Sequence, residues 1–252
     1  MNLTKTKSTS QVKAKVKAKP ETKNQTKNSK SVKSISHSPK IKKRLSGTER
    51  EQIIAQGAVR YFSEVGFGGD TRQLAQRLGV TQSLLYKYFP NKEALINRVF
   101  EEVYLDRWNP FWESIIKDRT IPLEERLTRL YIEYAKASLS RDWVRIFMFS
   151  GLRGEDINRK YLEILRLKIL EPIAIELRHE LKLPPKSEIP LKSAEIELVW
   201  SINARVFYYG QRQWIFDVPI QDSLDDLIRM TIAHFMAGAI VVMPQIVQPK
   251  LS

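Results

Sequence analysis

From residue 48 onward the apolar residues recur at intervals of three and four, which is the period of one buried helix face. Between 48 and 65, this spacing is followed by Ile54, Ala58, Tyr61, Phe62 and Val65. No segment shows the sustained alternation of a half-buried strand, and no internal repeat is present. The sequence therefore predicts an all-α fold.

Start and stop signals divide the first part of this region into helices. Thr48 with Glu51 three residues later has the spacing of a capping box, and the glycine-rich run at 66–69 ends that helix. A short helix opens at Asp70 or Thr71 and ends at Gly79, which is expected as a left-handed C′ residue.

Thr81 is expected to cap a second short helix, which runs to Phe89. Asn91 then caps a long helix towards Trp108 or beyond. Further helices are expected over about 122–139, 141–150, 155–183, 191–216 and 222–241. Within the third of these, Pro172 predicts a kink or break near Glu171.

The positive charge of the chain is concentrated at its N-terminus. The whole chain has a formal charge of +14, but residues 1–45 hold 13 Lys, one Arg and one Glu, a net of +13. The other 207 residues are therefore almost neutral. Because residues 1–45 contain no aromatic residue and few apolar ones, they are expected to be a disordered, Lys-rich tail.

Composition also excludes several classes of protein. There is no cysteine, and His37, His179 and His234 are scattered without a metal-ligand spacing, so neither a disulfide framework nor a metal site is expected. The longest apolar run, around Ala239–Met243, is far below the roughly 18–20 residues of a membrane span, and the basic N-terminus lacks the apolar stretch of a secretory signal. We therefore expect a cytoplasmic protein without membrane association.

Nothing in the sequence points to an enzyme or to a bound cofactor. There is no Gly-rich phosphate loop, no G-x-S-x-G elbow and no paired-carboxylate arrangement. His179 lies among charged residues and is interpreted as part of a solvated face. His234 lies beside Phe235 and Met236 and is interpreted as a core histidine rather than a catalyst.

Residues 70–89 have the pattern of a helix-turn-helix. Two short predicted helices are joined at 78–81 by a connection that contains Gly79, and such a connection lets the chain reverse sharply. In the second helix, Leu85 and Phe89 form an apolar face. The other face is polar and cationic, as a helix inserted into a DNA major groove requires, and it carries Gln82, Ser83, Tyr86 and Lys87.

Residues 53–95 resemble the N-terminal DNA-binding region of the tetracycline-repressor (TetR) family of bacterial transcription regulators. The stretches that carry the resemblance are residues 71–75 (TRQLA), 78–80 (LGV) and 85–95 (LYKYFPNKEAL). The resemblance implies a three-helix helix-turn-helix domain followed by a helical domain for effector binding and dimerisation. On this basis the expected domains are a tail at 1–45, a DNA-binding domain at 46–98, an effector-binding domain at 99–244 and a C-terminal tail at 245–252.

The resemblance also implies which residues contact DNA. Thr71 and Arg72 match the start of the first motif helix, which in the family approaches phosphates and base edges, and Lys92 matches a lysine that reaches the DNA backbone. The positions that match the recognition helix are Gln82, Ser83, Leu84, Tyr86, Lys87 and Tyr88.

Each recognition-helix residue suits a particular contact. Gln82 could bond an adenine through its amide, and Leu84 could pack on a thymine methyl group, although the family usually has a small or hydroxylated residue there. Tyr86, Lys87 and Lys92 suit phosphate contacts. Structural alternatives remain open: Tyr88 could pack in the core, and Arg72 could be an ordinary solvated charge. The residues expected in the core, and not in contact with DNA, are Phe62, Phe67, Leu85 and Phe89.

The C-terminal region is rich in aromatic residues. They are expected either to form a packed core with a dimer interface or to line an apolar ligand cavity between helices. The candidate ligand-binding residues are Phe147, Trp200, Asn203, Phe207 and Tyr208. Because the last two long helices of this family commonly pair with their mates, segments 191–216 and 222–241 are the candidate dimer interface.

The predicted function is a homodimeric regulator, a repressor, that binds a double-stranded DNA operator and is released by an unknown small-molecule effector. The two DNA-binding domains, one from each subunit, would contact half-sites about 34–36 Å apart. The alternative is a non-specific binder of nucleic acid or anionic surfaces that depends on the Lys-rich tail. In a third hypothesis, the head binds DNA and the body serves mainly to bind a partner.

Overall fold

The computed structural model describes residues 46–153 and 156–248, which all belong to the unit that begins at Leu45. Every regular element in these residues is a helix, so the predicted all-α fold is confirmed. The expected Lys-rich tail at 1–45 lies outside the described residues, as do residues 249–252. The expected C-terminal tail is described only at 245–248, where the last helix continues to Val247.

Four helices form the N-terminal head: α1 (Gly47–Val65), α2 (Thr71–Arg77), α3 (Gln82–Tyr88) and α4 (Lys92–Phe100). Each begins at a residue whose side-chain oxygen accepts a backbone N–H, as helix N-termini require. These caps are Ser46, Asp70, Thr81 and Asn91.

The predicted cap of the first helix was wrong by two residues. Ser46 and Glu49 form the capping box: Glu49 N–H donates to Ser46 Oγ at 3.1 Å, and Ser46 N–H donates to Glu49 Oε2 at 2.7 Å. The Ser46–Glu49 and Thr48–Glu51 pairs have the same spacing, and the preference for the earlier pair places Thr48 inside the helix. The caps predicted at Thr81 and Asn91 are confirmed.

The body of the protein contains seven further α-helices in the described residues. They are α5 (Trp112–Lys117), α6 (Leu123–Ser138), α7 (Arg141–Arg153), α8 (Asp156–Leu165), α9 (Glu171–Glu180), α10 (Ser193–Trp214) and α11 (Leu224–Val247). The short α5 was not predicted as a separate helix, although Asn109 and Pro110 stand just before it and separate it from the preceding segment.

Two π-helical turns, η1 (Glu101–Leu105) and η2 (Arg166–Leu170), modify the predicted long helices. Because of η1, the helix expected to run from 92 towards Trp108 is α-helical only to Phe100. The irregularity predicted near Glu171 is η2, which ends just before Pro172. A proline has no N–H to donate to the preceding turn, so a locally widened turn is a natural way to admit it.

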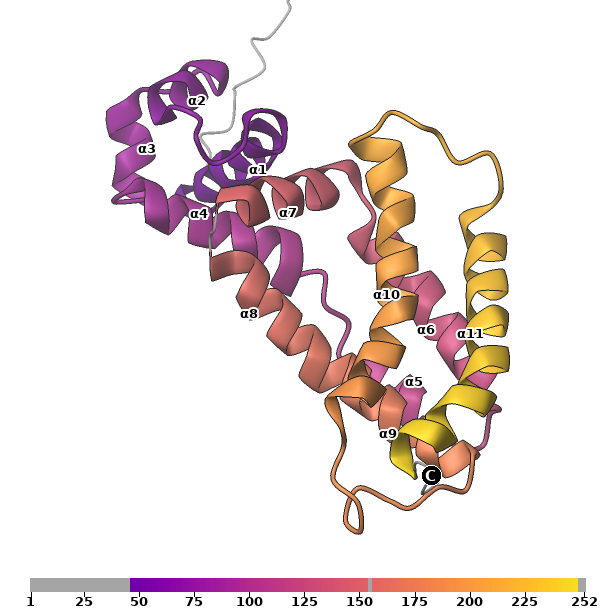
Figure 1. Cartoon of the computed structure of the whole chain (residues 1–252). Helices are drawn as coiled ribbons and strands as arrows, with labels where there is room; N and C mark the ends of the chain where they lie inside the picture. The colour runs from indigo at the N-terminus through magenta and orange to yellow at the C-terminus, as the bar shows by residue number, and fades with distance from the viewer. Residues whose placement is uncertain (1–45, 154–155, 249–252) are drawn as a thin grey trace, which may run out of the picture. The chain divides into compact units, whose positions relative to one another are not determined.

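Packing connects the head to the body through one apolar core. α1 packs on α4 and on α7, while α10 packs on α11, α7 and α9 (Figure 1). The buried side chains run without interruption from Leu74 and Leu85 in the head, through Val103, to Leu177 and Val206 in the body. One continuous core therefore joins the head to the body.

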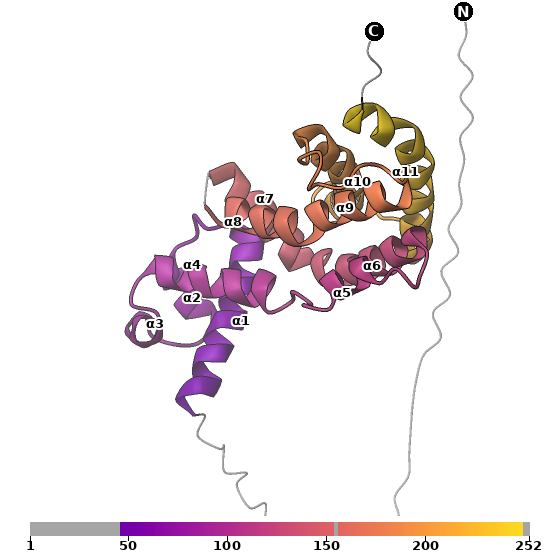
Figure 2. The ribbon, with the colours of Figure 1, turned by 90° about the horizontal axis from the view of Figure 1, so that it is seen from below.

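α11 lies at one edge of this unit, with α10 and α6 on one side of it (Figures 1 and 2). Its most apolar window has a mean hydropathy of 1.7, so α11 is long and apolar enough to cross a membrane by length and composition alone. The prediction that no segment meets this criterion was wrong, because it counted uninterrupted runs rather than average hydropathy. A single such helix is weak evidence, since core helices pass the same test.

His234 shows how the exposed face of α11 differs from the prediction. The imidazole was expected in the core, yet it is exposed, while its neighbours Phe235 and Met236 are buried. His179 is exposed on α9, as predicted. The apolar neighbours of His234 indicated a core position, but residues adjacent in a helix point about 100° apart.

Two buried arginines are neutralised by glutamates. Arg178 of α9 is 1% exposed and forms a two-pronged pair with Glu195 of α10, with donor–acceptor distances of 2.5 and 2.6 Å. The same guanidinium donates to carbonyls of Pro184, Ile189 and Pro190, and so holds the loop between these helices.

The second pair uses Glu176 of α9, which accepts from Arg119 and from the buried Arg126 of α6. Burial by itself would raise the pKa of Glu176, but the hydrogen bonds from the two guanidinium groups outweigh it and lower the pKa. Glu176 therefore stays ionised and ties α6 to α9.

Replacing Arg178 with alanine should lower the free energy of unfolding by about 3–5 kcal/mol, because the charge of Glu195 would be left buried without a partner. Urea denaturation followed by circular dichroism would measure the loss. Arg159→Ala is the control, because Arg159 pairs with Asp156 at the surface and is 76% exposed. That variant should stay within about 0.5 kcal/mol of the parent, and equal stability of both variants would contradict the prediction.

Candidate functional site

The helix-turn-helix of α2 and α3 is held against α1 by close packing. Leu78, in the turn, approaches Gly57 of α1 so closely that a β-carbon there would lie 2.2 Å from Leu78 Cδ2. Gly79 follows with φ +65°, the left-handed conformation predicted for it. Leu74 and Leu85 from the two motif helices are fully buried. The turn therefore sets the angle of α3 relative to the rest of the head.

Polar side chains of the two motif helices bond to one another. Thr71, at the start of α2, is 6% exposed, and its Oγ1 accepts from Gln82 Nε2 at 3.1 Å. The same Oγ1 lies 2.9 Å from the hydroxyl of Tyr86. Thr71 therefore fixes two α3 side chains, an amide and a phenol, in place on one face.

The rest of the outer face of α3 is solvent-accessible and carries positive charge. Ser83 and Lys87 of α3 and the neighbouring Arg72 of α2 are exposed, and the Tyr86 side chain is 37% exposed although its hydroxyl is bonded. The donors and the cationic groups on this surface are those that bond base edges and phosphates in a DNA groove.

Lys92, at the start of α4, contacts the loop before α2. Its Nζ donates to the carbonyl of Gly69 at 2.8 Å, and the side chain is partly buried. Arg77 of α2 pairs with Glu64 of α1 at 2.5 Å and stacks over the Tyr61 ring at 5.0 Å. Both contacts fix α2 relative to its neighbours.

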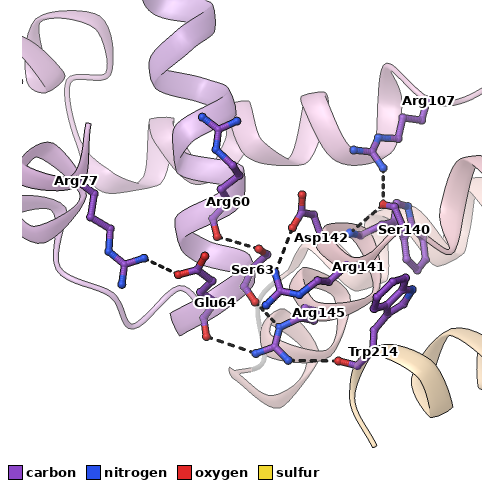
Figure 3. A network of polar contacts seen from close by, with 11 residues as sticks. Arg60, Ser63, Glu64, Arg77, Arg107, Ser140, Arg141, Asp142, Arg145 and Trp214 are labelled. Atoms are coloured by element: carbon purple, nitrogen blue, oxygen red, sulfur yellow. Dashed lines mark hydrogen bonds and ion pairs between the residues drawn. The ribbon is translucent and has the colours of Figure 1, made fainter. Parts of the chain in front are cut away.

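Arg145 of α7 joins the head to the body (Figure 3). Its Nε donates to the Ser63 carbonyl at 2.6 Å, and Nη2 donates to the Glu64 carbonyl at 3.4 Å, both at the end of α1. Nη1 donates to the Trp214 carbonyl at the end of α10, at 3.3 Å. One guanidinium thus satisfies the last carbonyls of two helices, which have no partner within their own helix.

The body contains a cavity of about 180 Å³ bounded by α6, α7, α8 and α10. Trp143 and Phe147 of α7 line one part of it, while Trp200, Asn203 and Phe207 line the α10 side. The lining contains no charged residue. Trp143 and Phe147 lie on α7 close to Arg145, so the cavity and the junction with the head share a helix.

The comparisons with known proteins identify the head. Residues 54–99 match the family model "Bacterial regulatory proteins, tetR family". This part of the chain is therefore similar to the DNA-binding region of tetR-family regulators. The chain is 32% identical over 99 residues to the tetracycline repressor protein class D of Escherichia coli and to the class H protein of Photobacterium damsela subsp. piscicida. Each alignment covers 36% of this chain and 44% of the relative, so it spans less than half of either relative.

Solved structures resemble a larger part of the chain. A TetR-like transcriptional regulator from Rhodococcus sp. RHA1 matches with a TM-score of 0.57 at 18% identity, covering 77% of this chain and 100% of that one. A tetR-family regulator from Streptomyces coelicolor matches with a TM-score of 0.54 at 16% identity, covering 80% and 85%. At these identities the likeness shows that the body shares the fold.

The predicted DNA contacts in the head fall into three groups. Arg72, Ser83, Tyr86 and Lys87 are exposed. Thr71, Gln82 and Lys92 bond within the head, while Leu84 and Tyr88 are partly buried, Tyr88 against the core. The contacts themselves remain predictions. The four residues predicted as core, Phe62, Phe67, Leu85 and Phe89, are all buried.

Of the five predicted ligand-binding residues, four line the cavity: Phe147, Trp200, Asn203 and Phe207. Tyr208 does not line it; this side chain is 50% exposed, and its ring lies near that of Phe216. Sequence reasoning missed Arg145. The available signal was one arginine in the otherwise apolar stretch 143–147 of an amphipathic helix.

Replacing Arg145 with lysine should loosen the end of α1, because one flexible ammonium cannot hold three carbonyls as the planar guanidinium does. We expect faster hydrogen exchange at the amide of Gly66, which donates to Phe62, and a stability loss of about 1–3 kcal/mol. Arg141→Lys is the control, since Arg141 pairs only with Asp142 among the described ion pairs. Unchanged exchange at Gly66 in Arg145→Lys would contradict the assignment.

Proposed function

We propose that this protein is a homodimeric, sequence-specific DNA-binding transcriptional regulator that represses until a small molecule releases it from its operator. The observation that carries the proposal is the ordered polar face of α3, where Thr71 holds Gln82 and Tyr86 in place. Because these groups are positioned before binding, less side-chain entropy is lost on contact with DNA. The tetR-family match over 54–99 supports the same conclusion.

The exposed face of α11 supports dimerisation. Met230, Ile240 and Val241 are 52–60% exposed, and they lie along one stripe with the exposed Ala233 and Ala237. An apolar stripe of this kind on an edge helix is typical of an interface between subunits. A two-fold axis beside α11 would bury both copies of the stripe and place two heads on successive major grooves.

Release would depend on the coupling between cavity and head. A ligand weakens DNA binding only if it binds better to a conformation whose heads no longer fit the two grooves. Trp143 and Phe147 contact the cavity, and Arg145 on the same helix holds the end of α1. A ligand that shifts α7 would therefore shift α1 and the attached motif.

The DNA-binding proposal is tested by selecting bound sequences from random DNA and measuring affinity for the selected site. Tyr86→Ala and Lys87→Ala should each weaken binding about 5- to 150-fold, equivalent to about 1–3 kcal/mol. Lys117→Ala, a change of the same charge on the exposed part of α5, should leave affinity unchanged. Undiminished binding by both α3 variants would contradict the interface.

The alternative, a non-specific binder that depends on the Lys-rich tail, is favoured by the net charge of +13 in residues 1–45. Removing residues 1–45 separates the two functions. A regulator should keep a sequence preference that resists added salt, with a smaller salt dependence than the full chain. A protein that loses all binding even at low salt would be the tail-dependent binder.

Dimerisation is tested by introducing a charge into the α11 stripe. Ile240→Asp should convert the dimer to monomer in light scattering, because two-fold symmetry buries two unpaired carboxylates, one from each subunit, at about 3 kcal/mol or more each. Leu167→Asp is the control, because Leu167 is similarly exposed, at 53%, but lies on η2. A dimer that persists in Ile240→Asp would exclude α11 as the interface.

A further inference from the structure

The cavity between α6, α7, α8 and α10 contains features that define the chemistry of its occupant. Its volume of about 180 Å³ is close to that of an engineered cavity, about 150 Å³, that binds benzene in another protein. One small ring system fits a space of this size. A molecule of four fused rings, such as tetracycline, would have to extend beyond it into the neighbouring surface depression.

The lining is uncharged. Its polar side chains include Tyr134 and Tyr161, whose hydroxyls lie 2.8 Å apart, and Ser138. Burial raises the pKa of both tyrosines, so the two phenols remain neutral. A charged ligand would therefore lose its hydration and find no counter-charge in the lining.

The aromatic rings of the lining favour a flat ligand. Trp143 and Phe147 are stacked at 5.1 Å with an interplanar angle of 7°. Phe207 meets both rings edge-on, at 5.8 and 5.1 Å. Such a wall presents ring faces and edges, against which another planar aromatic ring packs more favourably than a branched aliphatic group.

Asn203 supplies an unused hydrogen-bond acceptor. Its side chain is 7% exposed, it lines the cavity, and its Oδ1 has no hydrogen-bond partner. A buried acceptor of this kind favours a ligand that donates to it. An otherwise equal ligand without a donor leaves Oδ1 unsatisfied and binds more weakly.

The cavity adjoins a more open, polar depression on the surface. Trp200 and Leu162 line both spaces, and the outer one also has Arg159, Glu163 and Arg166 in its lining. A neutral ligand needs no ion pair with this charged rim and would bind in the uncharged cavity beyond it. The two shared side chains mark the boundary between them.

We propose that the effector of this protein is a small, uncharged, planar aromatic molecule of one or two rings with an N–H or O–H that donates to Asn203 Oδ1. The inference rests on the proposed function and narrows it to a class of ligand.

The test compares matched probes by isothermal titration calorimetry on the full chain. Indole and indene have nearly the same shape, but only indole has an N–H donor. Indole should bind at least about 10-fold more tightly than indene, while indole-3-carboxylate and tetracycline with Mg²⁺ should bind more weakly than either. Equal binding of indole and indene, tighter binding of the carboxylate or of tetracycline, or no binding by any probe at millimolar concentration would overturn the proposal.

Substitutions of Asn203 test whether the preference for indole over indene depends on its Oδ1. Asn203→Leu should abolish the difference between indole and indene, and Asn203→Ser should retain part of it. Asn97→Leu, the same change on the exposed side of α4, should leave the preference intact. If Asn203→Leu does not fold, as judged by circular dichroism, the Asn203→Ser variant and the probe series on the parent protein still decide the outcome.

The same samples separate failure of this inference from failure of the proposed function. Affinity for the selected DNA site is measured without any probe present. DNA binding without a donor preference overturns only the ligand class. A donor preference without sequence-specific DNA binding supports the ligand class and overturns the regulator.

Discussion

The contact on which the rest of this structure depends is the Arg145 guanidinium at the junction of three helices. It lies on α7 and bonds the final carbonyls of α1 and α10, so the head, the cavity wall and the last long helix pair meet at one side chain. Helix ends are the places where backbone groups lack partners, and an arginine fork can satisfy several at once. The position of the helix-turn-helix is therefore set from the body.

The head itself is held in a fixed arrangement by its own caps and side-chain bonds. The caps Asp70, Thr81 and Asn91 start its helices, and Gly79 turns the chain where a side chain would be strained. Thr71, though nearly buried, orients Gln82. Arg178 has a comparable role in the body, where it holds the loop before α10 by a network of buried bonds. Thr71 in the head and Arg178 in the body are both buried polar side chains, and each holds neighbouring surface residues in a fixed position.

Local signals allowed much of the fold to be predicted. Thr81, Asn91 and Gly79 act through bonds or backbone angles within a few residues, so their roles are readable from the sequence. Ser46 and Thr48 compete for the same role, and local spacing does not decide between them. Tyr208 and His234 were misplaced because the exposed side of a helix depends on what packs against it, and adjacent residues differ by about 100°.

The sequence by itself determined the all-α class, the helix-turn-helix and the resemblance of the head to the tetR family, because each depends on periodicity or on short motifs. Only the tertiary structure decided that Arg145 joins α1 to α10, that Asn203 lines an uncharged cavity with its Oδ1 unpaired, and that α11 exposes an apolar stripe. These features bring together residues separated by tens of positions. Such contacts follow from the packing of whole helices, which no local pattern specifies.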